Sequence, residues 1–174
     1  MIPIRGQRYE RPAFRSLNCF DLSAMEIQLP ASILTFPEGL PGFEAFHRFA
    51  LTAQTPPLML LRSVDRPELS FHAIPVSVLD SEYQLGIAPD DLRLLDLNDI
   101  DNQKSDLLCL AILAASEDGA ITANLLAPVI VNLAACTAVQ AVRSDARYSH
   151  RHPVIAGSCI ARTTPGSGSE EAGC

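Results

Sequence analysis

Short apolar runs separated by proline, glycine and aspartate fill the chain from about residue 32 onward. Most are rich in residue types that favour β-strands. The predicted strands lie at residues 33–36, 48–52, 58–63, 70–74, 77–79, 83–87, 121–125, 129–132 and 137–143. Residues 107–115 form a continuous apolar run, typical of a strand buried on both faces. A buried helix remains the alternative there, because periodicity alone cannot distinguish the two.

One segment has the pattern of a helix. Pro89 or Asp90 begins it, acidic side chains occupy its first turn, and Leu92 and Leu95 fall on one face. Many short strands with one or two short helices predict an all-β domain. We expect an antiparallel sheet curled into a small barrel or a sandwich, and the length of 174 residues is typical of a single domain.

The segment that follows the first predicted strand contains two glycines and two prolines in seven positions, Pro37–Phe43. Gly39 and Gly42 can adopt positive φ, whereas the prolines fix φ. We therefore expect a tightly shaped loop, held to the core by nearby apolar side chains. These are Phe36, Leu40, Phe43 and Phe46.

The two ends of the chain differ in composition from its centre. Residues 1–24 contain four arginines and no apolar stretch of a secretory signal, and Met25 is an alternative start. Residues 163–174 (TTPGSGSEEAGC) are low in complexity. We expect a poorly ordered extension at 1–24, a β domain at 25–160 and a disordered tail at 161–174.

The acidic charge is concentrated in one stretch. The chain has 13 basic and 20 acidic side chains, a net charge of −7. Between Asp80 and Asp118 ten acids face two bases, which gives −8 and leaves +1 for the rest. Direct nucleic-acid binding requires many basic contacts to phosphate, so this balance argues against it and favours a basic partner. A merely solvated acidic face is the alternative.

Neither a membrane span nor a disulfide framework is predicted. Residues 119–142 are uncharged, but Asn124, Pro128 and Asn132 would be costly in a spanning helix, so we expect strands there. Five cysteines lie far apart and are odd in number. This pattern favours reduced, mostly buried thiols in a cytosolic protein.

Signals for catalysis are weak. His150 and His152 have the spacing of two metal ligands on a strand but lack a third, and neither Cys159 nor Ser149 lies in a nucleophile motif. No glycine-rich phosphate loop follows a predicted strand. We expect no catalytic residues, no metal and no cofactor. A small metal- or thiol-dependent hydrolase using the two histidines and Cys159 is the alternative.

Four blocks of sequence carry a family resemblance. They are residues 36–44 (FPEGLPGFE), 61–65 (LRSVD), 122–132 (TANLLAPVIVN) and 147–153 (RYSHRHP). In order and spacing, across about residues 25–155, they resemble the FliW family of flagellar assembly factors. The resemblance implies a small, cytoplasmic, barrel-like all-β protein without catalytic activity. It also implies two partners, the RNA-binding translational regulator CsrA and flagellin.

In that family, free flagellin occupies the factor and leaves CsrA to repress flagellin translation. Export of flagellin releases the factor, which then removes CsrA from the mRNA. A flagellin export chaperone with no role in RNA regulation is the alternative. One departure concerns the turn at 133–136 (LAAC), where the family usually has basic residues. This uncharged turn puts a contact through the hairpin in doubt and favours an apolar patch.

A basic RNA-binding partner fits an acidic face, with charge raising the association rate and apolar anchors supplying affinity. We expect the face to lie in the acidic stretch, and solvated loop and helix-cap positions are the alternative. The loop at 37–43 is expected to shape the fold more than to make contacts. The candidate contact residues are Glu82, Tyr83, Asp90, Asp91, Asp96, Asp99 and Asp101.

Overall fold

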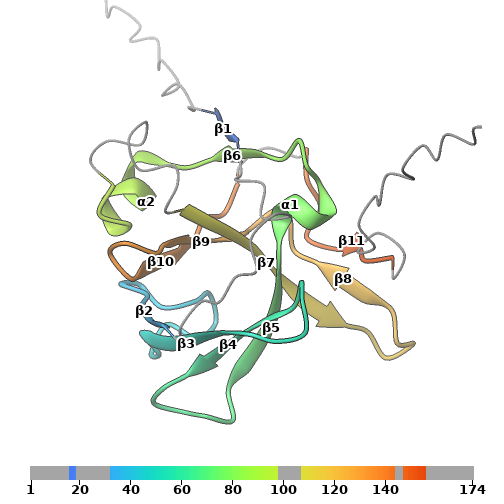
Figure 1. Ribbon diagram of the computed structural model, residues 1–174, viewed down its shortest axis with the longest axis horizontal. Coiled ribbons are helices and arrows are strands. Elements are labelled where there is room, and N and C mark those ends of the chain that lie inside the picture. Colours follow the sequence, from blue (N-terminus) through green and yellow to red (C-terminus); the bar gives the residue numbers. More distant parts are fainter. Residues whose placement is uncertain (1–15, 19–31, 98–106, 144–146, 156–174) are drawn as a thin grey trace, which may run out of the picture.

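Seven strands close into a barrel (Figure 1). The computed structural model describes residues 16–18, 32–97, 107–143 and 147–155. Around the ring the order is β7-β5-β4-β3-β2-β10-β9, and β9 pairs with β7 to complete it. The strands are β2 (Ser32–Thr35), β3 (Arg48–Ala53), β4 (Met59–Ser63), β5 (Ser70–Pro75), β7 (Leu107–Ala115), β9 (Val129–Asn132) and β10 (Thr137–Gln140).

Neighbouring strands of the ring are antiparallel with one exception. β10 lies parallel to β2, and the only register pair between them is Thr137 with Thr35. The first half of β7 pairs with β9, and its second half pairs with β8 (Ile121–Ala123), which in turn pairs with β11 (His152–Pro153). β7 therefore runs from the barrel into a flanking sheet, which explains its length.

Residues 76–97 cross the outside of the barrel. This segment contains α1 (Val76–Leu79), β6 (Gln84–Gly86) and α2 (Pro89–Leu94). β6 is not part of the ring and pairs only with β1 (Ser16–Asn18) among the described strands. Figure 1 shows β1, β6 and α2 on one side of the barrel, above β9 and β10.

The barrel wall separates two hydrophobic cores, an inner core within the barrel and an outer core beneath residues 76–97. Within β9, Val129 and Val131 pack inside the barrel, whereas Ile130 packs outside beneath residues 76–97. β7 alternates in the same way, with Leu110 inside and Cys109 outside. Burial on both faces explains why these strands read as continuous apolar runs rather than alternating ones.

The predicted all-β single domain, with two short helices, is confirmed, as is the strand at 107–115. The prediction of a strand at residues 77–79 is wrong, because Val76–Leu79 forms the single helical turn α1. The hairpin turn at 133–136 joins β9 to β10, and its last three side chains are exposed. The expected poorly ordered extension at 1–24 contains one strand, β1, and its other residues lie outside the described chain. The expected disordered tail at 161–174 also lies outside the described chain.

Within the described residues, no helix has the length and apolar character needed to cross a bilayer.

Candidate functional site

The loop between β2 and β3 has the tight shape that its glycines and prolines predict. Gly39 has φ +70°, and a Cβ there would lie 2.7 Å from the Cα of Glu44. Gly42 has φ +83°, and its N–H donates to Glu44 Oε1 at 2.7 Å. The glycines therefore bring Glu44 back against the loop. This hydrogen bond is also the main cause that lowers the pKa of Glu44.

All four apolar side chains expected to hold this loop are more than half-buried. Phe36 and Leu40 belong to the barrel core, and Phe46 packs at its edge. Phe43 is 36% exposed, and its ring lies against Phe71 with centroids 5.1 Å apart.

α2 begins as its sequence predicts and is followed by a residue with positive φ. Pro89 occupies the first helical position, where a missing N–H costs nothing, and Asp90 and Asp91 lie in the first turn. At the other end Asp96 has φ +56°. Its N–H donates to Arg93 O, and the N–H of Leu97 donates to Leu92 O, which together form a Schellman motif.

The end of α2 is fixed to the β9–β10 hairpin. The carbonyl of Leu95 accepts hydrogen bonds from Asn132 Nδ2 at 2.9 Å and from Thr137 Oγ1 at 3.0 Å. The Leu95 side chain is fully buried in the outer core. These contacts set the position of α2 over β10 and hence beside the β2–β3 loop.

A hollow of about 210 Å³ opens between α2, the β2–β3 loop and β10. Three carboxylates line it, those of Glu38, Glu44 and Asp91, and none of its lining residues is basic. The remaining lining residues are Gly39, Pro41, Val139 and Gln140. We call Glu38, Glu44 and Asp91, with this hollow, the acidic hollow.

The negative charge of Asp91 is disfavoured by its surroundings in the acidic hollow. The pKa of Asp91 is raised chiefly by burial, with a further contribution from the negative charge of Glu38. Asp90 is exposed, does not line the hollow and contacts Arg93 as an ion pair. Arg93, the basic residue of α2, thus pairs with Asp90, whereas Asp91 lies with the carboxylates of Glu38 and Glu44.

The remaining predicted contact residues do not join the hollow as one patch. Asp96 is exposed at the end of α2, and Glu82 is exposed in the turn that precedes β6. Asp99 and Asp101 lie outside the described residues. Glu82 is separated from α2 by the length of β6.

Tyr83 is not a surface residue. Its side chain is 1% exposed, its hydroxyl donates to Leu125 O at 2.7 Å, and its ring lies 4.3 Å from that of Tyr148. The prediction that Tyr83 belongs to an exposed contact face is corrected: this residue joins the outer core. Tyr83 precedes Leu85 and Ile87 at strand spacing, and all three are buried.

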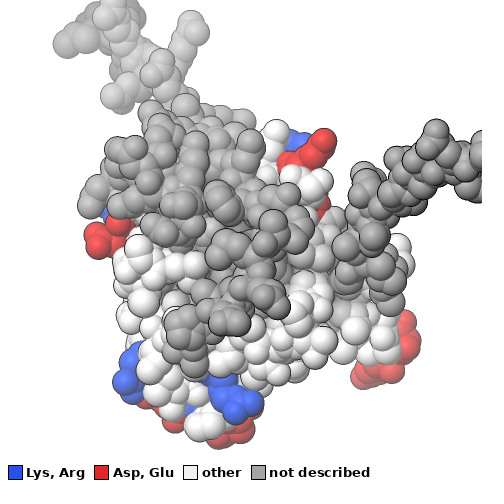
Figure 2. Space-filling model, viewed as in Figure 1, with Lys and Arg blue, Asp and Glu red and all other residues white. Residues whose placement is uncertain are grey.

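The acidic stretch divides between the two ends of β7. The end of α2 lies near the start of β7, because Asn132 bonds to Leu95 and pairs in register with Leu107. Glu117 and Asp118 lie instead in the turn after Ala115, at the other end of β7. Nine strand residues span about 26 Å at about 3.3 Å a step. This exceeds the screening length of about 8 Å at physiological salt, so the two groups act separately. Figure 2 shows acidic atoms at separate places around the molecule.

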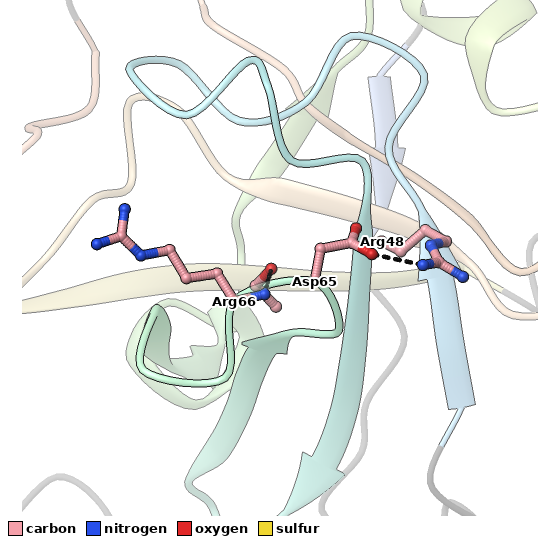
Figure 3. A network of polar contacts seen from close by, with 4 residues as sticks. Arg48, Asp65 and Arg66 are labelled. Carbon is pink, nitrogen blue, oxygen red and sulfur yellow. Dashed lines mark hydrogen bonds and ion pairs between the residues drawn. The ribbon is translucent and has the colours of Figure 1, made fainter.

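Two arginines outside α2 form local ion pairs. Arg48 Nη2 lies 2.5 Å from Asp65 Oδ1, and Arg66 Nε lies 2.9 Å from Glu68 Oε1. Figure 3 shows the guanidinium of Arg66 directed away from the Arg48–Asp65 pair. Neither arginine lines the acidic hollow.

The histidines are not arranged as the hydrolase alternative requires. His152 lies in β11, but His150 lies in the preceding turn, so they are not two side chains on one face of a strand. In the described part of the chain no three His, Cys, Asp or Glu side chains gather as metal ligands. Cys159 lies outside that part. Of the described cysteines, Cys109 is buried and Cys136 is exposed.

Sequence reasoning identified Asp91 but missed Glu38 and Glu44 as members of the same site. Both glutamates stand within the block FPEGLPGFE, at its third and last positions. The tight glycine pattern was the available signal, since it turns the loop back on itself and gathers its polar side chains.

Comparison with known proteins gives consistent matches. Residues 21–155 match the family model described as FliW protein. The chain is 40% identical over 126 residues to "Flagellar assembly factor FliW" of Treponema pallidum (strain Nichols), covering 71% of this chain and 81% of that protein. It is 32% identical over 130 residues to the protein of the same name from Bacillus subtilis (strain 168), covering 73% and 88%.

The fold also matches a solved structure. A chain described as "Crystal structure of the flagellar assembly factor FliW" superposes with a TM-score of 0.62 at 27% identity, covering 70% of this chain and 84% of that one.

Proposed function

Because the chain belongs to the FliW family of flagellar assembly factors, we propose that it antagonises the translational regulator CsrA and binds flagellin. It does so in the cytoplasm, by binding proteins and without catalysing a reaction. Free flagellin occupies the factor, and export of flagellin makes the factor available to capture CsrA. Flagellin synthesis is thereby coupled to assembly.

The acidic hollow is the observation that carries the CsrA half of this proposal. A protein that holds RNA phosphates presents basic side chains, and a hollow lined by Glu38, Glu44 and Asp91 offers them complementary charge. Burial chiefly raises the pKa of Asp91, and insertion of a cation would relieve the further contribution from the charge of Glu38. Site and partner therefore fit each other electrostatically.

Some of the other predicted contact residues lie on or near α2, outside the hollow. Asp90 and Asp96 lie on α2 and at its end, and Asp99 follows closely in sequence, as does Asp101. In this proposal the charges of Asp90 and Asp96 on and beside α2 would steer a basic partner during approach, and Asp99 and Asp101 stay predicted contacts. Glu82 lies apart, beside β6, and is a peripheral contact in this proposal.

The proposal is tested by competition for CsrA. The full chain is titrated into a complex of CsrA with labelled RNA, at several salt concentrations and with or without flagellin. We expect RNA to be released, less so at high salt, and flagellin to suppress the release. Absence of release at every salt concentration would contradict CsrA antagonism. Flagellin binding without RNA release would favour an export chaperone instead.

Two variants of equal charge change locate the surface. Glu38→Gln/Asp91→Asn removes two charges from the hollow, and Glu117→Gln/Asp118→Asn removes two from the far end of β7. Both replacements retain polar side chains of similar size. We expect the first to slow CsrA association by about three- to tenfold at low salt and to flatten its salt dependence, and the second to change neither appreciably. Equal effects from both variants would place the contact elsewhere.

A further inference from the structure

β1 is a strand added to an edge outside the barrel. Ser16, Leu17 and Asn18 lie antiparallel to Gly86, Leu85 and Gln84 respectively (Figure 1). The family match begins at residue 21, so β1 precedes the part of the chain that matches other members. The barrel closes through β7 and β9 without any contribution from β1.

The edge of β6 that β1 covers can be identified from its hydrogen bonds. The N–H of Gln84 donates to Tyr148 Oη at 3.0 Å, and the carbonyl of Gln84 accepts from Arg143. Polar groups of successive strand residues face opposite edges, so those of Leu85 face β1. Leu17, the partner of Leu85 in the register, is therefore the residue whose backbone groups complete this edge.

The first residue of β1 pairs with the end of β6 that leads into α2. Ser16 lies opposite Gly86, and the pairing is antiparallel. Extended in the same direction, a chain before Ser16 would run alongside the residues that follow Gly86. α2 begins three residues after Gly86, at Pro89, and carries Asp90 and Asp91 in its first turn.

The start of the chain has the opposite charge to α2. Residues 1–15 contain four arginines and one acid, Glu10, so their side chains carry +3. The arginines are Arg5, Arg8, Arg11 and Arg15. Fifteen residues reach up to about 50 Å when extended, which is ample to pass from β6 over α2 to the hollow.

From these observations we propose that residues 1–15, which we call the basic arm, dock onto the acidic hollow and α2 of the same chain. β1 anchors the arm, and its arginines compete in cis with a basic partner. The inference rests on the proposed function in that the hollow is taken as the partner's site. Tethering gives the arm an effective concentration near the millimolar range, so even weak contacts compete.

Cross-linking tests docking without any partner. The full chain with Arg5, Arg8, Arg11 and Arg15 each replaced by Lys keeps its charge and gains four amines, in a protein whose sole lysine is Lys104. A zero-length carbodiimide joins amines to carboxylates in contact. We expect links from the introduced lysines to Glu38, Asp90 or Asp91, lost in 1 M NaCl. Links that are absent, or directed equally to Glu117 and Asp118, would overturn the proposal.

A second variant tests the anchor. Leu17→Pro removes the N–H that faces Leu85, whereas Leu17→Ala keeps it. We expect Leu17→Pro to speed hydrogen exchange at the Leu85 amide by at least about tenfold and to reduce the cross-links, and Leu17→Ala to do neither. Unchanged exchange in Leu17→Pro would mean that β1 does not anchor the arm and would overturn the proposal.

The competition itself is measured with CsrA. The chain with the four arginines replaced by Gln should associate with CsrA about two- to tenfold faster than the parent at low salt, and equally fast at high salt. An unchanged rate at low salt, with the cross-links present, would overturn competition in cis. Failure of every variant to bind CsrA, with the cross-links present, would instead refute the proposed function and leave the docked arm standing.

Discussion

The side-chain amide of Asn132 joins the end of α2 to the β9–β10 hairpin. Asn132 Nδ2 donates to the carbonyl of Leu95 at 2.9 Å, and Oδ1 accepts from the N–H groups of Ala134 and Ala135 at 3.1 and 3.2 Å. Asn132 is 3% exposed. One buried side chain thus holds both the helix that carries Asp91 and the turn beside it.

Replacing Asn132 by alanine should destabilise the fold. Asn132→Ala removes three hydrogen bonds and leaves buried polar groups without this partner, so we expect a loss of about 2–3 kcal/mol. Urea unfolding measures it. Asn132→Asp keeps the acceptor for the turn but sets a carboxylate against the Leu95 carbonyl, and it should lose at least as much. A loss below about 0.5 kcal/mol in both variants would contradict this role of the amide.

Tyr83→Phe should affect stability and leave partner binding unchanged. The substitution keeps the ring against Tyr148 but removes the hydrogen bond to Leu125 O, at a cost of about 1–2 kcal/mol. Thermal unfolding measures the cost, and stopped-flow association with CsrA measures binding. A slower association rate at unchanged stability would show instead that Tyr83 contacts the partner.

Asp96→Gly should stabilise the protein. Asp96 ends α2 at φ +56°, a conformation that costs an L-residue roughly 1 kcal/mol and costs glycine nothing. We expect a gain of up to about 1 kcal/mol in the free energy of unfolding. Asp96→Ala removes the same charge but keeps the strained backbone, and so serves as the control. Equal gains in both variants would mean that the charge, and not the backbone, is responsible.

Sequence patterns predicted the strands well because the barrel wall buries its strands strongly. β7 and β9 read as continuous apolar runs, since one face of each packs inside the barrel and the other beneath residues 76–97. α1 was mistaken for a strand because a single turn is too short to reveal helical periodicity, and two of its four residues are valine. Ring closure depends on the β7–β9 and β2–β10 pairings, which no local pattern encodes.

The candidate site was only half visible in the sequence. Counting charges along the chain identified Asp90 and Asp91, but it could not bring Glu38 beside Asp91, 53 positions away. The same counting joined Glu117 to α2, although β7 holds them far apart. Tyr83 was placed on the surface because it lies in the acidic stretch, whereas its strand spacing with Leu85 indicated burial.

The carboxyl of Asp91 should titrate above its ordinary range, and Glu38 should be one cause. Burial raises the pKa of Asp91 most, and the charge of Glu38 raises it further. Glu38→Gln should therefore lower the pKa of Asp91 without restoring its ordinary value, because the burial remains. Side-chain carboxyl NMR measures the titration of Asp91 in the parent protein and in Glu38→Gln. High salt should lower the pKa of Asp91 in the parent protein but hardly in Glu38→Gln.

The sign of the effect on stability follows from this raised pKa. Between the ordinary and the raised value the folded state holds more protons than the unfolded state, so stability falls as pH rises through that window. Below the window the cost is absent, and at neutral pH it is fully present. Glu38→Gln should accordingly stabilise the fold at pH 7, by at most about 0.5 kcal/mol at so accessible a site, and have little effect below the window. Glu117→Gln is the matched control. An Asp91 pKa that responds equally to both substitutions, or to neither, would show that Glu38 does not act on it across the hollow.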